Sequence, residues 1–274
     1  MAQITALNIY PVKSCRGIAL ERASVTQTGF EHDREWMIVR PGGQFMTQRE
    51  EPRLALIETA LSADGLQLRN PDAEAILVPP DASHAEVEVT CWRDRCAAFD
   101  AGDAAAQWLS AFLGKPARLV RFDRRRKRAS DLAWTRGAEA LNQFSDAFPW
   151  LLISQASLDD LNGRLPKPLP MNRFRPNIVV DGLSAYAEDS VREFIIDGVK
   201  LLRVKPCTRC AITTTDQATA ARESDEPLRT LREYRFSREL KGVLFGQNLI
   251  LTEGMGRELR VGQRLEVTFE GANG

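Results

Sequence analysis

Apolar residues in the first part of the chain alternate with polar ones or form short runs, and turn-forming residues such as Pro41-Gly42-Gly43 separate them. Segments of this kind are typical of strands in antiparallel sheets. The expected strands are Ile4–Tyr10, Ile18–Val25, Trp36–Val39, Gln44–Thr47, Leu54–Leu61, Leu66–Leu68, Val87–Trp92 and Ala97–Phe99. The pattern therefore predicts an antiparallel β domain.

Three segments carry helix-capping residues, which are an Asp or Ser at the start, a Gly after the last turn, or a Pro in the first turn. They are Ala104–Leu113 after Asp103, Gln155–Asn162 after Ser154, and Pro227–Phe236. Further apolar runs predict strands at Ala117–Phe122, Leu151–Ile153, Ile178–Val180, Phe194–Ile196, Val199–Val204, Leu244–Leu251 and Leu265–Phe269. We expect an α+β fold dominated by strands, with a domain boundary near Leu119.

The stretch Val204–Asp216 contains two cysteines three positions apart, in Cys207-Thr208-Arg209-Cys210. Pro206 is expected to end the strand before them. The β-branched run Ile212–Thr215 predicts a strand after them. A thioredoxin-type C-x-x-C opens a helix instead, and the helix N-terminus lowers the thiol pKa. The pattern therefore favours a loop between two strands over a thioredoxin-type redox motif.

Composition narrows the choice of partners and compartment. The chain has 37 basic and 37 acidic residues and a formal net charge of zero, so we expect no nucleic-acid partner. The basic run Arg124–Arg128 is more typical of a solvated loop than of a phosphate or nucleic-acid contact. Five cysteines are too few for a disulfide scaffold and indicate a reducing compartment. Without a basic leader or a membrane-length apolar run, the chain is expected to be cytoplasmic, with no membrane partner.

The cysteines allow a zinc site as an alternative. Cys207 and Cys210 have zinc-ribbon spacing, and Cys91 with Cys96 could complete four thiolates. The second pair has a different spacing and lies in the other predicted domain, so the sequence disfavours structural zinc. A plain structural role for two half-buried cysteines in a tight loop also stays open.

Several short motifs follow one another in a definite order along nearly the whole chain. They are Tyr10–Cys15, Asp33–Trp36, Thr47–Leu54, Phe174–Ile178, Tyr186–Asp189, Lys205–Asp216 and Phe245–Asn248. In this order they resemble the motifs of the MOSC domain, the molybdenum-cofactor sulfurase C-terminal domain, and of the N-terminal β-barrel domain that accompanies it. The chain is most similar to the amidoxime-reducing components of mitochondria and their bacterial counterparts. The resemblance implies two β-barrel-like domains, at residues 1–118 and 119–274.

The resemblance also implies a site for a molybdenum cofactor (Mo-molybdopterin) in the cleft between the two domains, a usual place for a ligand. Cys210 would be the metal ligand and the catalytic residue, because a thiolate suits a soft metal centre. Cys207 would not bind the metal. The positions matched to cofactor contacts are Lys13, Ser14, Arg34, Arg49, Arg175, Asn177, Thr208 and Arg209. The segment Ser145–Pro149 stands where the mitochondrial relatives carry Thr-Ser, so any cofactor contact there would come from the backbone or from Ser145 or Asp146.

A protein of this kind would reduce N-hydroxylated compounds, converting N–OH to N–H. The chain ends at Gly274 without the ferredoxin-like cysteines of some bacterial relatives. Electrons are therefore expected from a separate flavin, iron–sulfur or cytochrome protein. One alternative is a sulfur-transfer, cofactor-maturation or carrier protein that uses a loop cysteine. A storage or zinc-binding module without enzymatic activity is the other alternative.

Overall fold

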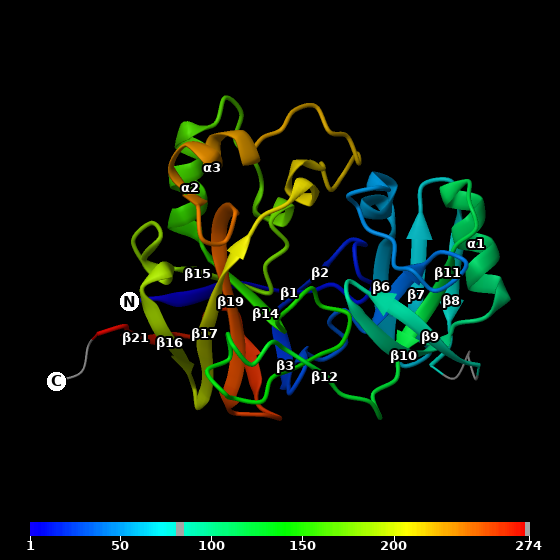
Figure 1. Cartoon of the computed structure of the whole chain (residues 1–274), viewed down its shortest axis with the longest axis horizontal. Coiled ribbons are helices and arrows are strands. Elements are labelled where there is room, and N and C mark those ends of the chain that lie inside the picture. Colours follow the sequence, from blue (N-terminus) through cyan, green and yellow to red (C-terminus); the bar gives the residue numbers. More distant parts are fainter. Residues whose placement is uncertain (81–84, 272–274) are drawn as a thin grey trace.

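Strands dominate the computed structural model, which describes residues 1–80 and 85–271 and divides into two halves (Figure 1). The three α-helices of the described residues are α1 (Asp103–Leu113), α2 (Gln155–Arg164) and α3 (Leu228–Tyr234). The β-dominated α+β class predicted from the sequence is confirmed. None of these helices is long and apolar enough to cross a membrane.

The largest sheet forms the half at the left of Figure 1. Its strands are β1 (Gln3–Ile9), β2 (Ile18–Leu20), β14 (Trp150–Ser154), β15 (Ile178–Asp181), β16 (Val191–Ile196), β17 (Val199–Thr208), β18 (Phe236–Ser237), β19 (Gly242–Glu253) and β21 (Glu266–Phe269). The strand order is β2-β1-β15-β14-β19-β17-β16-β21, and β18 pairs with β19. Only the β14–β15 pair is parallel among these strands.

Both faces of this sheet are covered, because side chains of a strand alternate between its faces. Leu152 of β14 packs in one core with Phe194 and Leu249. The next residue, Ile153, packs in another core with Phe174 and Phe245, under residues of α2 and α3. The alternation explains why β14, with all five residues buried, has a nearly continuous apolar sequence.

The other half contains a four-stranded sheet of order β5-β11-β10-β9 and a three-stranded sheet of order β6-β7-β8, with α1 packed beside them. Their bounds are β5 (Trp36–Val39), β6 (Glu58–Ser62), β7 (Gly65–Asn70), β8 (Ala73–Val78), β9 (Glu86–Cys91), β10 (Asp94–Asp100) and β11 (Arg118–Phe122). The α1 side chains Leu109 and Phe112 are buried in its core with Leu54 and Leu68. This is the core role that helical spacing favours.

Strands from the start of the chain join the later half. The strands β3 (Arg22–Thr26) and β4 (Gly29–Phe30) form a small sheet with β20 (Glu258–Arg260), and β12 (Arg128–Ala129) pairs with β13 (Leu141–Asn142). The strand β1 pairs with β15, so residues on either side of the predicted domain boundary share a sheet. Within the described residues no sheet closes into a barrel, and the largest one ends at β2 and β21.

The structure corrects two local predictions around the cysteines. The strand β17 does not stop at Pro206 but continues to Thr208. Proline is tolerated in a sheet at bulges, and the register shifts on both sides of Pro206. The predicted strand Ile212–Thr215 is wrong, because Ala211–Thr214 forms a 3₁₀ turn. The hydroxyl of Thr213 donates to the carbonyl oxygen of Cys210 at 3.0 Å, a local bond that outweighs β propensity.

Two further boundaries differ from the sequence prediction. The segment Pro52–Leu56 is a 3₁₀ helix, and the strand predicted from Leu54 begins only at Glu58. Asp103 is the first residue of α1 rather than its N-cap, a position held by Gly102 with φ of 89°. Ser154 caps α2 as predicted, accepting a hydrogen bond from the Ser157 amide.

Candidate active site

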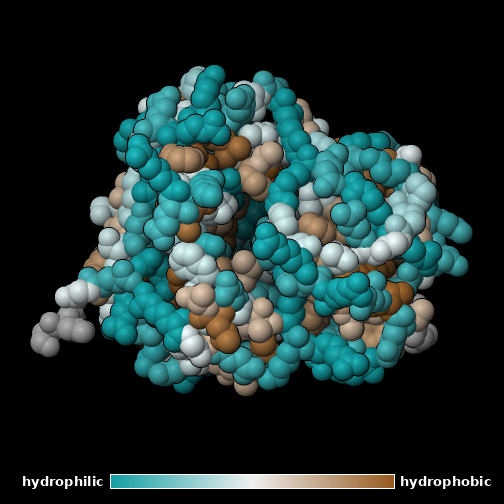
Figure 2. Space-filling model, in the orientation of Figure 1, coloured by the Kyte–Doolittle hydropathy of each residue, from teal (hydrophilic) through white to brown (hydrophobic). Residues whose placement is uncertain are grey.

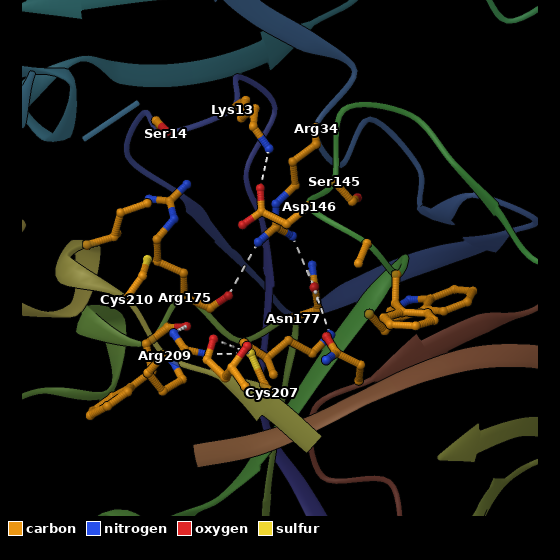
Figure 3. Close-up of a pocket in the computed structure, with 18 of the residues that line it drawn as sticks. Lys13, Ser14, Arg34, Ser145, Asp146, Arg175, Asn177, Cys207, Arg209 and Cys210 are labelled. Carbon is orange, nitrogen blue, oxygen red and sulfur yellow. Dashed lines mark hydrogen bonds and ion pairs between the residues drawn. The ribbon is translucent and has the colours of Figure 1, made fainter. Parts of the chain in front are cut away.

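A cleft opens between the two halves and is visible as a hollow near the centre of Figure 2. All of the predicted site residues except Arg49 line it, and Figure 3 shows most of them converging on one space. The lining set is Lys13, Ser14, Arg34, Ser145, Asp146, Arg175, Asn177, Thr208, Arg209 and Cys210. Residues distant in the sequence are thus brought to a single site.

Cys210 follows the end of β17 and begins the 3₁₀ turn Ala211–Thr214. The Arg49 Nε atom donates to its Sγ atom at 3.3 Å, which places Arg49 at the edge of the cleft. The Arg49 guanidinium in turn stacks on the ring of Trp92, 4.2 Å from the ring centre. Arg49 therefore gives the Cys210 sulfur a charged hydrogen-bond donor from the other half of the chain.

Cys207 lies within β17 and differs from Cys210 in its surroundings. Burial raises the pKa of the Cys207 thiol, although the nearby Arg209 charge opposes this rise. The Arg209 Nη1 atom donates to Cys207 Sγ at 3.0 Å, and its Nη2 atom donates to the Phe174 carbonyl oxygen at 2.6 Å. Arg209 thus connects Cys207 to the segment that enters β15.

Two arginines stack on one aromatic ring beside the cleft. The guanidinium carbons of Arg34 and Arg175 each lie 4.2 Å from the ring centre of Tyr10. Both arginines have left-handed backbone, with φ of 50° and 56°, as does Ser14 with 67°. Such conformations cost free energy in residues with a Cβ atom and concentrate at functional sites. Burial of its guanidinium, with the Arg34 charge nearby, lowers the pKa of Arg175 to about 10, so it stays charged at neutral pH.

Asn177 holds this arrangement to the large sheet. Its Oδ1 atom accepts hydrogen bonds from Arg34 Nη1 at 3.0 Å and from the Leu151 amide at 3.2 Å. Its Nδ2 atom donates to the Asn8 carbonyl oxygen at 3.1 Å. Through these bonds Asn177 fixes the position of the Arg34 guanidinium relative to the large sheet.

On the opposite wall, Lys13 is buried, donates to the Phe144 carbonyl oxygen at 2.7 Å and forms an ion pair with Asp146. The indole nitrogen of Trp92 donates to the same carboxylate at 3.1 Å. Desolvation in the cleft opposes ionisation, but the Lys13 and Arg49 charges hold the pKa of Asp146 well below its usual range. Asp146 is therefore ionised at neutral pH.

Contacts across the cleft fix the two halves next to the cysteine loop. The amides of Gln48 and Gln217 exchange two hydrogen bonds, at 2.9 and 3.1 Å, and both side chains are buried. Arg222 donates to the Arg49 carbonyl oxygen at 3.0 Å and to the Thr215 hydroxyl at 2.8 Å. The segment after Cys210 is thereby tied to the motif that carries Arg49.

Comparison with known proteins identifies the family of this chain. A family model of the MOSC N-terminal beta barrel domain matches residues 1–116, and one of the MOSC domain matches residues 140–266. The mitochondrial amidoxime-reducing component 1 of Mus musculus is 37% identical over 253 residues, which are 89% of this chain and 74% of the relative. The Homo sapiens component 1 is 38% identical over 266 residues, covering 90% and 78%, and the Bos taurus component 2 is 36% identical over 241 residues, covering 85% and 72%. The chain belongs to the MOSC family of amidoxime-reducing components.

Buried polar atoms test whether this MOSC protein can hold the cofactor its family implies. Ser145 Oγ and Trp150 Nε1 are buried without a hydrogen-bond partner, and both residues line the cleft. Unsatisfied buried polar atoms are costly and indicate an absent partner. The lining contains four cations and a single carboxylate, that of Asp146. The cleft therefore fits an anionic, hydrogen-bonding group with a metal that a thiolate can bind.

The other cysteines of the MOSC protein lie apart from the cleft. Cys91 and Cys96 are buried in the core of the four-stranded sheet with Val89 and Phe144. Within residues 1–80 and 85–271, no group of three or more His, Cys, Asp and Glu is arranged to hold a metal ion. Cys91 and Cys96 thus do not join Cys207 and Cys210 in the four-thiolate zinc site considered from the sequence.

Sequence reasoning missed three aromatic residues of this site. Tyr10 belongs to the first matched motif but was not assigned to the site, and its ring stacks with both Arg34 and Arg175. Trp92 lies in a hairpin turn and contacts Arg49 and Asp146 through long-range packing that leaves no local pattern. Trp150 begins an apolar strand, so its position predicted a core residue and not a free indole N–H.

Proposed function

We propose that this protein reduces N-hydroxylated compounds to the corresponding N–H compounds with a molybdenum cofactor bound in the cleft. The observation that carries the proposal is the position of Cys210, a thiol held by Arg49 inside the converging set of matched residues. The curated relatives are named amidoxime-reducing components, and they match most of the chain. An amidoxime contains an N–OH group, the group that this reaction removes.

Each matched residue has a chemical role in this proposal. Cys210 would supply the sulfur ligand, and Arg49 donates a hydrogen bond to that sulfur. Arg34 and Arg175 provide charged donors for the anionic parts of the cofactor, and arginine forks suit phosphate oxygens. Ser145 Oγ and Trp150 Nε1 are free to form hydrogen bonds with its polar edge. When bound, the cofactor supplies two-electron reduction, which together with two protons converts N–OH to N–H and releases water.

Asp146 is poorly suited to donate those protons. Its carboxylate is held ionised by Lys13 and Arg49, so it can accept a hydrogen bond at neutral pH but has no proton to give. We therefore propose that solvent supplies the protons and that Asp146 orients the substrate or the cofactor. Electrons come from a separate flavin, iron–sulfur or cytochrome protein. All five cysteines are free, in keeping with a reducing compartment, which we propose to be the cytoplasm.

Elemental analysis and donor assays test the proposal together. Protein from a host that makes the cofactor should contain stoichiometric molybdenum and reduce benzamidoxime with reduced viologen as donor. NADH alone should give no turnover, since the proposal assigns electron supply to another protein. Protein without molybdenum that carries a persulfide on a loop cysteine would support sulfur transfer instead. Stoichiometric zinc would support a metal-binding module.

A further inference from the structure

The basic run Arg124–Arg128 is uniform in sequence but not in structure. Arg124, Arg125 and Lys127 each pair with a nearby carboxylate, and their side chains are 46%, 64% and 65% exposed. The Arg128 side chain is only 9% exposed. The prediction of a solvated loop is therefore wrong for Arg128, and its burial requires another explanation.

Every nitrogen of the Arg128 guanidinium has a partner. Its Nε atom pairs with Asp94 at 2.7 Å. Its Nη1 atom donates to the carbonyl oxygens of Gln143 and Ser145 at 2.9 and 2.7 Å, and its Nη2 atom donates to that of Asp146 at 3.3 Å. One side chain thus binds three backbone carbonyls of a four-residue segment. Only an arginine side chain could make these contacts together, because its guanidinium holds several N–H donors in one rigid plane.

The segment Gln143–Asp146 is a wall of the cleft, and we refer to it as the cofactor loop. With its carbonyls turned to Arg128, the side chains of Ser145 and Asp146 line the cleft. Ser145 Oγ has no partner, and Asp146 accepts from Lys13 and Trp92. Asp94, the remaining partner of Arg128, begins β10 directly after the turn that carries Trp92. Arg128 therefore joins the cofactor loop to the hairpin of Trp92.

We propose that Arg128 is a positioning residue of the cofactor site: it holds the cofactor loop so that Ser145 and Asp146 present their side chains to the bound cofactor. The inference rests on the proposed function, since it assigns the loop to cofactor binding. Arg128 would thus act on the site through the cofactor loop, since it does not itself line the cleft.

The test measures the rate of molybdenum loss from the cofactor-loaded protein during dialysis. Arg128→Lys keeps the charge but can reach only part of the three carbonyls, and it should release the cofactor about tenfold faster than wild type. Arg126→Ala and Lys127→Ala change neighbouring cations that do not contact the loop, and they should match wild type. Equal release rates for Arg128→Lys and wild type would overturn the proposal.

A double-mutant cycle separates positioning from a general structural role. Ser145→Ala removes the side chain that Arg128 is proposed to place. Combined with Arg128→Lys, it should accelerate release by less than the product of the single effects. Arg175→Ala lies outside the loop, so its effect should multiply with that of Arg128→Lys. If Ser145→Ala and Arg175→Ala both multiply with Arg128→Lys, the lysine variant weakens the protein generally and the proposal fails.

Hydrogen exchange keeps the inference testable if the proposed function fails. If the wild-type protein binds no molybdenum, the proposed function is wrong. Amide exchange of the cofactor loop can then still be measured in the cofactor-free chain. Amides of residues 143–147 should exchange about tenfold faster in Arg128→Lys than in wild type, while those of β11 stay unchanged. Equal exchange at residues 143–147 would show that Arg128 does not hold the loop.

Discussion

Arg49 and Cys210 belong to opposite halves of the chain, and the Arg49 Nε atom lies 3.3 Å from the Cys210 Sγ atom. The contact joins the proposed metal ligand to a motif 161 residues earlier in the sequence. Its chemistry is local, a charged donor at a thiol, but its geometry depends on how the two halves meet. A substitution that changes how the two halves pack should therefore disturb the hydrogen bond to the Cys210 thiol even where the cysteine loop keeps its structure.

The two loop cysteines should respond differently to substitution. Cys210→Ser should abolish reduction of benzamidoxime and alter the electronic absorption of the molybdenum centre, because the thiolate ligand is lost. Cys207→Ser should keep the metal and much of the activity, because Cys207 contacts Arg209 and lies within β17. Activity assays with elemental analysis of both variants check this. Loss of metal from Cys207→Ser alone would reverse the assignment.

Arg49→Ala should make Cys210 less reactive. A hydrogen bond from a charged donor contributes about 1.5–3 kcal/mol, so loss of the thiolate's partner should slow its alkylation about tenfold or more. The measurement uses cofactor-free protein, iodoacetamide and a Cys207→Ser background, in which the remaining cysteines are buried. An unchanged alkylation rate would mean that the Arg49 contact does not influence the thiol.

Trp92 supports Arg49 and Asp146 through two different parts of its side chain. Trp92→Phe removes the indole hydrogen bond to Asp146 but keeps a ring under the Arg49 guanidinium. Trp92→Ala removes both. A cation–π contact contributes about 0.5–1 kcal/mol at an exposed site, so cofactor retention should fall about two- to fivefold further in the alanine variant. Equal cofactor retention in both variants would show that the stacking of Arg49 on Trp92 does not contribute to retention.

Arg34 and Arg175 should be needed to retain the cofactor. Each is expected to lose tenfold or more in retention as alanine, since a charged hydrogen bond contributes about 1.5–3 kcal/mol. Cofactor binding to the folded state raises its stability, so loaded wild-type protein should melt above the cofactor-free form. Both alanine variants should lose most of that difference in melting temperature. Arg125→Ala and Arg126→Ala are the matched controls and should keep full occupancy.

The lowered pKa of Asp146 should make the folded protein less stable as the pH falls. Its pKa in the folded protein lies below the ordinary aspartate value of about 3.9. Its contribution to stability is therefore present above about pH 5 and is lost as the pH falls toward the folded-state pKa. Urea unfolding of the cofactor-free protein should show stability falling more steeply on acidification in wild type than in Asp146→Asn. Parallel curves would show that the carboxylate is not stabilised by Lys13 and Arg49.

The fold class predicted from the sequence is confirmed, whereas the assignment of residues to a cofactor site stays a prediction, although most of those residues line one cleft. Lys13, Ser14, Arg175 and Asn177 were assigned to the site by matching the motifs Tyr10–Cys15 and Phe174–Ile178 to the family, and the fold brings them to one cleft. Patterns could not show that Arg128 turns inward, since every member of a basic run is equivalent in local sequence. The 3₁₀ turn after Cys210 was missed because hydrogen bonds of threonine hydroxyls outweighed β propensity.

The pairing of β1 with β15 has a consequence for exchanging parts between relatives. The first family model ends at residue 116 and the second begins at residue 140, so a cut for making chimeras would be placed between them. Such a cut would transplant β1, β2 and β3 with the first domain and leave the recipient's large sheet with a foreign edge against β15. Chimeras that keep residues 1–30 together with the later half should preserve the native sheet. The segments that the two family models match are therefore not segments that can be exchanged between proteins without disturbing the large sheet.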